Sequence, residues 1–238
     1  MRRIGSTGKG VGAASAEKVL RTPNTILAGQ IGWLADYLGD VAVRANEVAQ
    51  KGGEVFLEGT QGFGLSLHHG YFPYVTSRDT TAGALCSEAG LSPTLVNEII
   101  MVVRTFPIRV AGPSGPLPHE IDWETITKES GAPTSVVEKT TVTDKVRRVA
   151  RFDPEIVKRA CVVNRPTQIA LMFLDYLDWR NRSVTSLGRL TRSAQEFIDT
   201  TQTLCDVPVT LVGTGPRAAD IIDLRGVKPA GCAKGAKV

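Results

Sequence analysis

One glycine-rich segment of the sequence carries an unusual density of groups that could bind a ligand. It is EGTQGFGLSLHHGYFPYVTSRDTTAG, residues 58–83, and it has little strand or helix periodicity. Gln61 offers amide donors and an acceptor, and Thr76 offers a hydroxyl, which suits a purine edge or a phosphate. Glycines allow the tight turns and close backbone approach that a ligand needs. The same polar groups could instead cap the loop itself, so the residues alone leave both interpretations open.

A second non-periodic segment, TTVTDKVRR at residues 140–148, combines hydroxyl groups with cations. Such side chains can hold a carboxylate or a phosphate through bidentate hydrogen bonds. The alternative is an exposed basic loop with no ligand.

Near the start, GSTGKG at residues 5–10 has the glycines and the lysine of a phosphate-binding turn. Its spacing differs from G-x-x-x-x-G-K-[ST], and the four residues before Gly5 are too few for the strand that leads into a phosphate loop. A dinucleotide-binding G-x-G-x-x-G element after a strand is also missing from the sequence. This motif taken alone therefore does not establish phosphate contact.

The histidines and cysteines do not predict a metal site. His68 and His69 are adjacent, His119 is the third histidine, and the four cysteines are far apart with no C-x-x-C pair.

The elements that must position these segments alternate between helices and strands. Apolar spacing of three and four predicts an amphipathic core helix at residues 26–48. Start and stop signals and apolar runs predict the other elements: a strand at 54–57, a short helix from Ser92-Pro93, extended chain at 100–110, a helix from Asp153-Pro154 to Val163, a strand at 168–174, a helix at 193–204 and a strand at 207–212. Continuous apolar strands alternating with helices predict an α/β fold with a largely parallel sheet flanked by helices.

In parallel sheets, ligands gather beyond the carboxyl ends of the strands. Three predicted strands lead into loops with polar residues: EGTQG follows Leu57, LDYLD follows Phe173, and GTGP follows Val212. Residues 113–148 begin with three closely spaced prolines, two of them preceded by glycine, and have little periodicity, so we expect a long binding excursion. We expect one domain over residues 1–225 and a disordered basic tail at 226–238.

Composition narrows the class of partner. The chain has 238 residues, 42% of them hydrophobic, and a net charge of +4. Its cations are not interleaved with aromatic residues, which disfavours a nucleic-acid surface. Its apolar runs are shorter than the roughly 20 residues of a membrane span, and no secretory leader is evident. We expect small acidic substrates and a cytoplasmic location.

Five segments, in the same order, resemble the signatures of adenylosuccinate synthetases, the ligases of purine biosynthesis. They are GSTGKGVGAASAEKVLR at 5–21, the HGYFPYVTS and TTAG parts of 58–83, the loop at 140–148, ALMFLD at 170–175 and GTGP at 213–216. The resemblance covers about residues 3–225. It implies a P-loop-ligase-like fold that is N-terminally truncated here, because the family's first signature, G-D-E-G-K-G-K with the catalytic aspartate, does not occur in this sequence.

The resemblance also implies binding roles. The IMP-binding residues are Thr7, Arg21, Gln61, Thr76 and Lys145. The aspartate-binding loop is Thr141, Val142, Thr143, Asp144, Lys145, Val146 and Arg147. The nucleoside triphosphate would be bound by Arg147, Phe173, Leu174, Asp175, Gly213, Thr214 and Gly215. Catalytic residues and Mg²⁺ ligands are expected outside this chain, and Arg21 acting across subunits would require a homodimer.

Three departures from the family pattern affect this interpretation. Ala13-Ala14-Ser15 stands where Pro-Ala-Tyr is usual, and Lys145 stands where arginine is usual. Phe173 replaces the lysine that covers the base, which puts the preference for guanine in doubt.

The implied reaction joins L-aspartate to IMP with hydrolysis of GTP. The alternatives are a phage-type enzyme that makes aminoadenylosuccinate from dGMP and ATP, and a non-catalytic nucleotide-binding fragment. We expect the isolated chain to bind substrates without turning them over.

Overall fold

A computed structural model describes residues 4–5, 8–141 and 144–226, and the chain divides into two compact units. The first unit comprises Met1–Ile99, Pro107–Asp122 and Val137–Pro166, and the second comprises Ile100–Phe106, Trp123–Val136 and Thr167–Val238. We describe each unit by itself. The expectation of one domain over residues 1–225 stays a prediction.

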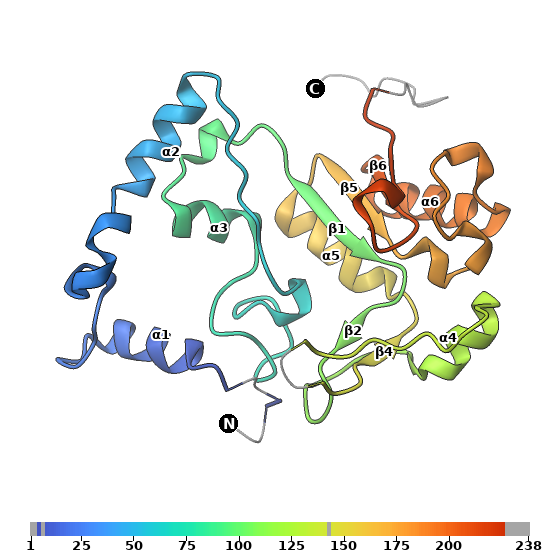
Figure 1. Cartoon of the computed structure of the whole chain (residues 1–238), viewed down its shortest axis with the longest axis horizontal. Coiled ribbons are helices and arrows are strands. Elements are labelled where there is room, and N and C mark those ends of the chain that lie inside the picture. The colour runs from blue at the N-terminus through green and yellow to red at the C-terminus, as the bar shows by residue number, and fades with distance from the viewer. Residues whose placement is uncertain (1–3, 6–7, 142–143, 227–238) are drawn as a thin grey trace. The chain divides into compact units, whose positions relative to one another are not determined.

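The second unit is built on a four-stranded sheet in the order β1-β5-β6-β7 (Figure 1). Its strands are β1 (Ile100–Arg104), β5 (Gln168–Met172), β6 (Val209–Gly213) and β7 (Ile221–Asp223). Strands β1, β5 and β6 are parallel, with Val102 opposite Ala170, and β7 is antiparallel to β6. The predicted α/β class and largely parallel sheet are confirmed.

Strand β5 lies at the centre of this sheet because both of its faces are apolar. Ile169 and Leu171 are fully buried, and Ala170 between them is 5% exposed. Helix α6 (Arg192–Cys205) begins at Thr191, whose hydroxyl accepts from Ala194 N, and it buries Ala194, Ile198 and Thr201 on one face. Helix α4 (Trp123–Ser130) also belongs to this unit.

In its described residues, the first unit contains four α-helices and a small antiparallel sheet in the order β2-β4-β3. Its elements are α1 (Val11–Leu20), α2 (Val41–Gln50), α3 (Ala82–Ala89), α5 (Pro154–Asn164), β2 (Ile108–Arg109), β3 (Glu120–Ile121) and β4 (Arg148–Ala150). Helix α5 begins as predicted, with Asp153 accepting from Glu155 N at 3.0 Å and proline in the first turn. Asn164 Oδ1 accepts from Ala82 N at 2.9 Å, which joins the end of α5 to the start of α3.

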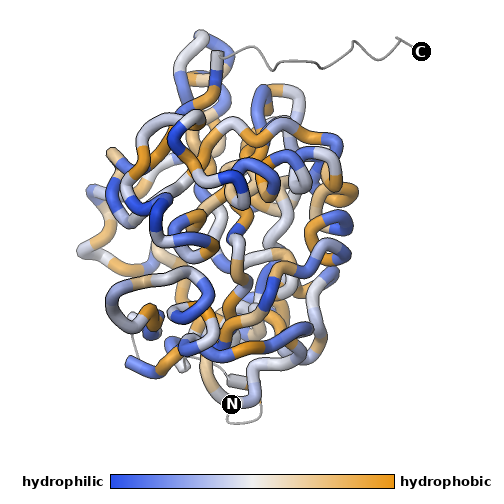
Figure 2. The backbone as a smooth tube through the Cα atoms, turned by 90° about the vertical axis from the view of Figure 1, so that its right-hand side faces the viewer, coloured by the Kyte–Doolittle hydropathy of each residue, from blue (hydrophilic) through white to orange (hydrophobic). Residues whose placement is uncertain are grey.

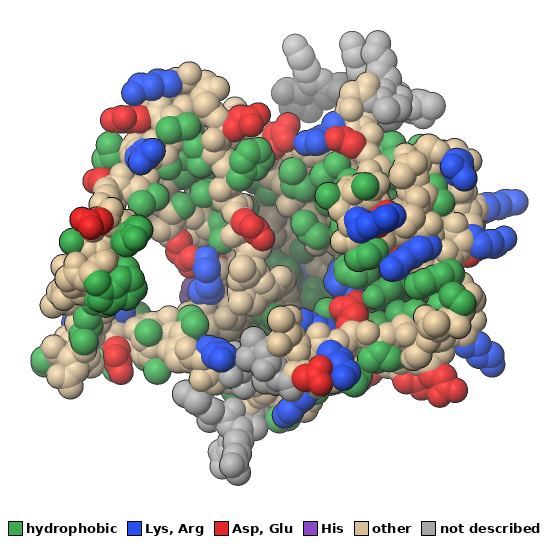
Figure 3. Space-filling view, in the orientation of Figure 1, with side chains coloured by type: hydrophobic (Ala, Val, Ile, Leu, Met, Phe, Trp, Pro, Cys, Tyr) green, Lys and Arg blue, Asp and Glu red, His purple; other side chains and the backbone are tan. Residues whose placement is uncertain are grey.

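The predicted helix at residues 26–48 is wrong. The chain forms 3₁₀ turns at Ala28–Gln30 and Gly32–Tyr37, and α2 begins only after Asp40, whose carboxylate accepts from Val43 N at 3.0 Å. The apolar spacing spans Gly39 and this capping aspartate, both of which interrupt a helix. This segment is not part of the core either, since Trp33 and Tyr37 are 76% and 82% exposed. Hydrophobic side chains are visible at the left of Figure 3, over this part of the chain.

Two other expectations were wrong. Residues 54–57 form no strand, because no described segment pairs with them, and Phe56 is 84% exposed. The excursion at 113–148 is more regular than predicted, since it contains β3 and α4. Helix α4 buries Trp123, Ile126 and Ser130, a spacing of three and four that the nearby glycines and prolines obscured in the sequence.

Six further short segments of the described chain are 3₁₀-helical. They are Phe63–Leu65, Pro93–Leu95, Leu174–Tyr176, Trp179–Asn181, Leu187–Arg189 and Ala218–Asp220. Hydrophobic stretches along the chain are short and interrupted by hydrophilic ones (Figure 2), and none of the described helices has the length and apolar character to cross a membrane. The tail predicted at 226–238 lies outside the described residues except for Gly226.

Candidate functional site

The glycine-rich segment at 58–83 folds back on itself through its own backbone. Leu65 O accepts from Thr76 N at 2.8 Å, Gly64 O accepts from Tyr71 N at 3.1 Å, and Ser66 O accepts from Gly70 N at 2.9 Å. A side chain at Gly70 could not be accommodated, since an added Cβ would lie 2.6 Å from the carbonyl oxygens of Gly64 and Ser66. The loop is therefore a compact structure with a fixed shape.

Ser66 and Asp79 form the polar centre of this loop. Ser66 is fully buried, and its hydroxyl donates to Asp79 Oδ1 and accepts from His69 N at 2.9 Å. Asp79 also accepts from Thr81 Oγ1 at 2.6 Å. Burial alone would raise the pKa of Asp79, but the hydrogen bonds from Ser66 and Thr81 outweigh it and hold the pKa below its usual value. Asp79 is thus an ionised anchor at the base of the loop.

The two predicted ligands in the loop have different surroundings. Gln61 is exposed and has a left-handed backbone with φ of +63°, which is uncommon for a residue with a side chain. Its side-chain oxygen accepts from Thr60 Oγ1. Thr76 is half-buried, and its backbone rather than its hydroxyl closes the loop. Their predicted role in nucleotide binding stays a prediction.

Arg109 on β2 fixes the part of the loop around Tyr74. It is 8% exposed, and its guanidinium donates to Ser114 O at 2.6 Å and to Tyr74 O at 2.7 Å. Burial lowers its pKa. The sequence did not single out Arg109, because its acceptors are backbone carbonyl groups that no motif reveals.

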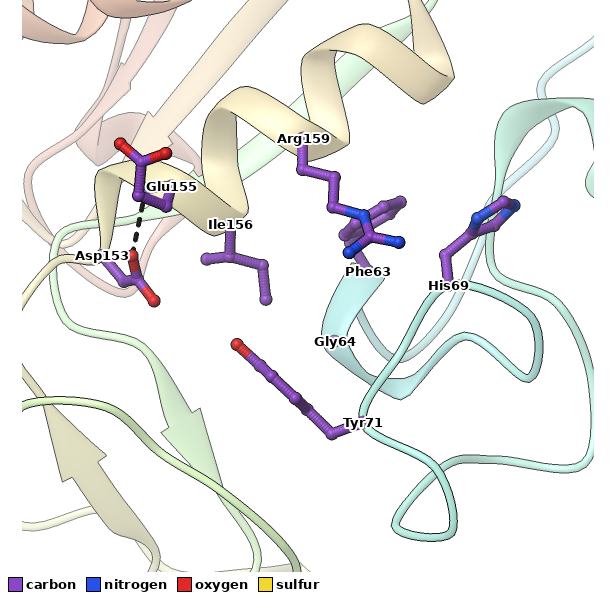
Figure 4. Close-up of a pocket in the computed structure, with 8 residues that line it drawn as sticks. All are labelled: Phe63, Gly64, His69, Tyr71, Asp153, Glu155, Ile156 and Arg159. Carbon is purple, nitrogen blue, oxygen red and sulfur yellow. Dashed lines mark hydrogen bonds between the residues drawn. The ribbon is translucent and has the colours of Figure 1, made fainter.

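A pocket of about 180 Å³ lies between this loop and the start of α5 (Figure 4). It is lined by Phe63, Gly64, His69, Tyr71, Asp153, Glu155, Ile156 and Arg159. Burial and the Asp153 carboxylate raise the pKa of the Tyr71 hydroxyl. Neither Gln61 nor Thr76 lines this pocket, so it does not coincide with the predicted ligands of the loop.

An antiparallel bridge between Lys139 and Val146 brings the two ends of the basic segment at 140–148 together. Thr140 is buried, and its hydroxyl accepts from Lys145 N at 3.1 Å. Thr141, Asp144 and Lys145 are exposed on this loop, and Asp144 pairs with Lys139 at 3.2 Å. The structure thus brings together these predicted residues and exposes their side chains to solvent.

The flanks of this loop differ. Arg147 is half-buried, with its Nε 3.4 Å from Lys139 O, and Val146 is exposed. Val142 and Thr143 lie outside the described residues, as does Thr7. Arg21 ends α1 in a left-handed conformation with φ of +54° and is exposed, so it is not part of a core.

In the second unit, the predicted base-binding residues follow β5 directly. Phe173 has φ of +69°, a left-handed backbone that an aromatic residue rarely adopts. Thr105 Oγ1 donates to Phe173 O at 2.8 Å, and the Arg104 guanidinium lies 3.6 Å from the centre of the Phe173 ring. These contacts from the end of β1 hold the turn after β5, with Leu174 fully buried beneath it.

Asp175 is the most unusual charged group in this turn. It is 1% exposed, and one carboxylate oxygen, Oδ2, is paired with the Arg182 guanidinium. The other oxygen, Oδ1, is buried without a hydrogen-bond partner in the described structure. Burial raises the pKa of Asp175, and Arg182 offsets part of that rise. A buried acceptor left unpaired costs about 1–3 kcal/mol, so this oxygen favours a ligand that donates to it.

The predicted loop after β6 is held rigidly in the same unit. Thr214 is fully buried, its N donates to Asp220 O at 3.0 Å, and its carbonyl accepts from Ser183 N at 3.1 Å. A Cβ at Gly215 would lie 2.6 Å from Asp220 Oδ2, so a larger residue there would displace the Asp220 side chain. The Arg217 guanidinium lowers the pKa of Asp220 to about 2.

Among the described residues, no group of three histidine, cysteine, aspartate or glutamate side chains could hold a metal ion.

Three residues that the sequence did not single out support the predicted ones: Arg182 pairs with Asp175, Arg104 covers Phe173, and Asp220 holds Gly213–Gly215. In the sequence, a basic residue a few positions after an acidic residue at the end of a strand is the signal that could have identified Arg182.

Comparison with known proteins gives consistent matches. The family model for adenylosuccinate synthetase matches residues 27–182. The adenylosuccinate synthetases of Methanocaldococcus jannaschii and Archaeoglobus fulgidus are each 42% identical to this chain over 94% of it, covering 62% and 64% of their own lengths. The chain therefore spans less than two thirds of these relatives.

Solved structures agree with the sequence relatives. The succinoaminodeoxyadenylate synthetase of cyanophage S-2L, bound to dGMP and to dATP as energy donor, matches with a TM-score of 0.73 and 29% identity over 93% of this chain and 62% of that one. The fully ligated adenylosuccinate synthetase of Plasmodium falciparum shares the fold, with a TM-score of 0.71 and 20% identity over 80% of this chain and 55% of that one.

Proposed function

Because this chain belongs to the adenylosuccinate synthetase family, we propose that it binds the substrates of a carbon–nitrogen ligase that joins L-aspartate to IMP with GTP hydrolysis in AMP biosynthesis. The observation that supports the proposal is the buried Asp175, which follows β5 where the sequence resembles the family's base-binding segment and which has one carboxylate oxygen without a partner. A cytoplasmic location fits this role.

The proposed reaction has two steps. N1 of IMP loses its proton as the γ-phosphoryl group of the triphosphate moves to O6, and the nucleoside diphosphate leaves. The aspartate amine then attacks C6, the C6–O bond breaks to release phosphate, and the nitrogen loses a proton as the new C–N bond forms. Both steps move negative charge, so cations and hydrogen-bond donors around the reacting groups are the main requirement of the protein.

Each described region supplies part of this requirement. Gln61 and Thr76 would bind the monophosphate nucleotide, with Thr7 and with Arg21 from a second subunit of a homodimer. Exposed Lys145 and half-buried Arg147 would pair with anionic groups of the nucleotides or of aspartate. The segments 173–175 and 213–215 would bind the base of the triphosphate.

The family's Mg²⁺ would neutralise phosphate charge during transfer. The described acids do not form a cluster that fits it, and Asp79, Asp175 and Asp220 are each already bonded to protein groups. We therefore assign neither the Mg²⁺ ligands nor the catalytic residues to the described part of the chain and assign no step to the ion here.

A second candidate function has support from one observation. The cyanophage S-2L synthetase, which was solved with dGMP and dATP, is 29% identical over nearly the whole chain. A chain that takes dGMP and ATP would make aminoadenylosuccinate in place of adenylosuccinate. A non-catalytic nucleotide-binding protein is the third candidate, and the test below separates all three.

The test has a binding arm and a turnover arm. The purified chain is titrated with IMP, dGMP, GTP and ATP by calorimetry, and then mixed with aspartate, Mg²⁺ and each nucleotide pair while product absorbance is followed. We expect binding of one monophosphate and one triphosphate without turnover. Turnover would overturn the view that this chain lacks the reacting groups, and the absence of any nucleotide binding would overturn the proposed function.

A second turnover experiment adds the part of the Methanocaldococcus jannaschii synthetase that lies outside its match to this chain. Product formed only by the mixture would assign a ligase role to this chain, and the monophosphate consumed would decide between IMP and dGMP. Nucleotide binding with no product in the mixture would favour the non-catalytic candidate.

A further inference from the structure

Arg182 changes what the carboxylate of Asp175 can offer to a base. Its guanidinium binds Oδ2, so only Oδ1 remains to accept a hydrogen bond. Arg182 is well placed to stay there, because it lies 4.7 Å from the centre of the Trp179 ring while its side chain is 36% exposed. The ion pair thus presents a buried acceptor, Asp175 Oδ1, and a partly exposed guanidinium with several N–H donors.

The two purines need different partners on this edge. Guanine has two donors side by side, N1–H and the 2-amino group, and a carboxylate with both oxygens free accepts from both. Adenine has an acceptor at N1 beside its 6-amino donor, so two free carboxylate oxygens would face its N1 lone pair. A free aspartate therefore selects guanine, because adenine would leave an acceptor opposite another acceptor.

An aspartate paired with arginine offers one acceptor beside one donor. Adenine matches it by donating from its 6-amino group to Oδ1 and accepting at N1 from the guanidinium. Guanine matches it too, by donating from N1–H and accepting at O6, and its 2-amino group then finds no acceptor. Arginine has five N–H donors, so pairing with Oδ2 leaves others available.

Resting on the proposed function of this site, we infer that Arg182 sets its base preference: by holding one oxygen of Asp175, it removes the two-acceptor edge that selects guanine and admits adenine nucleotides as phosphoryl donors. Arg182 is a specificity-determining residue in this assignment, since it acts on the base and not on the reacting phosphate.

The inference can be tested first on the unsubstituted chain. Saturation-transfer NMR on the base H8 proton gives affinities for ATP, GTP and inosine triphosphate, which is guanine-like but has no 2-amino group. We expect ATP and GTP to bind within about tenfold of each other, and inosine triphosphate to match GTP, because the 2-amino group has no acceptor. Inosine triphosphate binding about tenfold or more weaker than GTP would overturn the inference.

The variant Arg182→Gln then frees the second oxygen of Asp175. We expect the affinity ratio of GTP to ATP to rise by about tenfold and inosine triphosphate to fall below GTP. Arg180→Gln is the matched control, since Arg180 pairs with Asp178 at 2.6 Å and its side chain is 80% exposed. An Arg182→Gln ratio equal to that of the control would overturn the inference.

The outcomes also separate this inference from the proposed function. If Arg182→Gln does not fold, the inosine triphosphate comparison decides alone. If none of the three triphosphates shows saturation of its base proton, the base site itself is wrong and the proposed function fails. If all three bind with ratios unaffected by Arg182, the site stands and only the role of Arg182 fails.

Discussion

The two units place their candidate ligands in opposite ways. In the first unit, Gln61 and Lys145 are exposed side chains on loops whose shapes are set by backbone hydrogen bonds. In the second unit, Asp175 and Thr214 are buried side chains that follow strands β5 and β6. In the first unit, the position of the candidate binding residues therefore depends on the geometry of the loops. In the second unit, it depends on buried charged and polar groups. The predictions below perturb one side of this comparison at a time.

The largest expected effect is on loop geometry in the first unit. Gly70→Ala places a Cβ 2.6 Å from two carbonyl oxygens, so we expect a loss of about 3 kcal/mol in the free energy of unfolding, measured by urea denaturation. Gly83→Ala is the control, because it lies in α3 with open space around it, and it should be neutral or slightly stabilising. Equal stability of the two variants would mean that the loop is not held as described.

The next effect also belongs to the loop. Arg109→Met leaves the carbonyl groups of Tyr74 and Ser114 without their donor, which should cost about 2 kcal/mol of unfolding free energy. Arg44→Met, on the exposed face of α2, should change stability by less than about 0.5 kcal/mol. If Arg109→Met matches this control in urea, Arg109 does not organise the loop.

In the second unit, we expect the substitution of Asp175 to lower nucleotide affinity while changing the stability of the fold only a little. Asp175→Ala removes the only oxygen that the base would bond, so we expect affinity for GTP and for ATP to fall about tenfold or more. The thermal midpoint should change little, because the variant also removes a buried charge that burial disfavours. Nucleotide affinity that stays within about twofold of the parent would show that Asp175 is a structural acid only.

A smaller effect is expected at the exposed basic loop. Lys145→Ala should weaken monophosphate binding by about three- to tenfold, because an exposed charge pair contributes roughly 1 kcal/mol. The loss should shrink as salt is added, since exposed charges are screened. Lys51→Ala, on the surface at the end of α2, serves as the control and should leave affinity unchanged.

The smallest effect is a pH dependence in the second unit. The pKa of Asp220 is about 2 in the folded chain against 3.8 ordinarily, so its stabilising contribution is present above about pH 4 and is lost as the pH falls toward 2. The thermal midpoint of Asp220→Asn should therefore change less than that of the parent between pH 4 and pH 2. The exposed Asp206→Asn should follow the parent; a parallel curve for Asp220→Asn would contradict the Arg217 pairing.

Much of the fold could be predicted from local sequence. Strands β5 and β6 and helices α5 and α6 lie close to their predicted positions, because apolar runs and capping residues act within a few neighbours along the chain. The failures have the opposite cause. Residues 54–57 have the composition of a strand but no described partner strand, and a strand exists only as part of a ladder.

The sequence by itself determined the family, the order of the signature segments and which residues could serve as ligands, since those depend on residue type and spacing alone. Only the tertiary structure decided that Arg109 is buried beneath one loop and that Arg182 takes one oxygen of Asp175 while the other stays unpaired. Burial and charge pairing depend on which segments the fold brings into contact, and those segments can be far apart in the sequence. Burial and charge pairing in turn set the pKa values and decide which polar atoms stay available to a ligand.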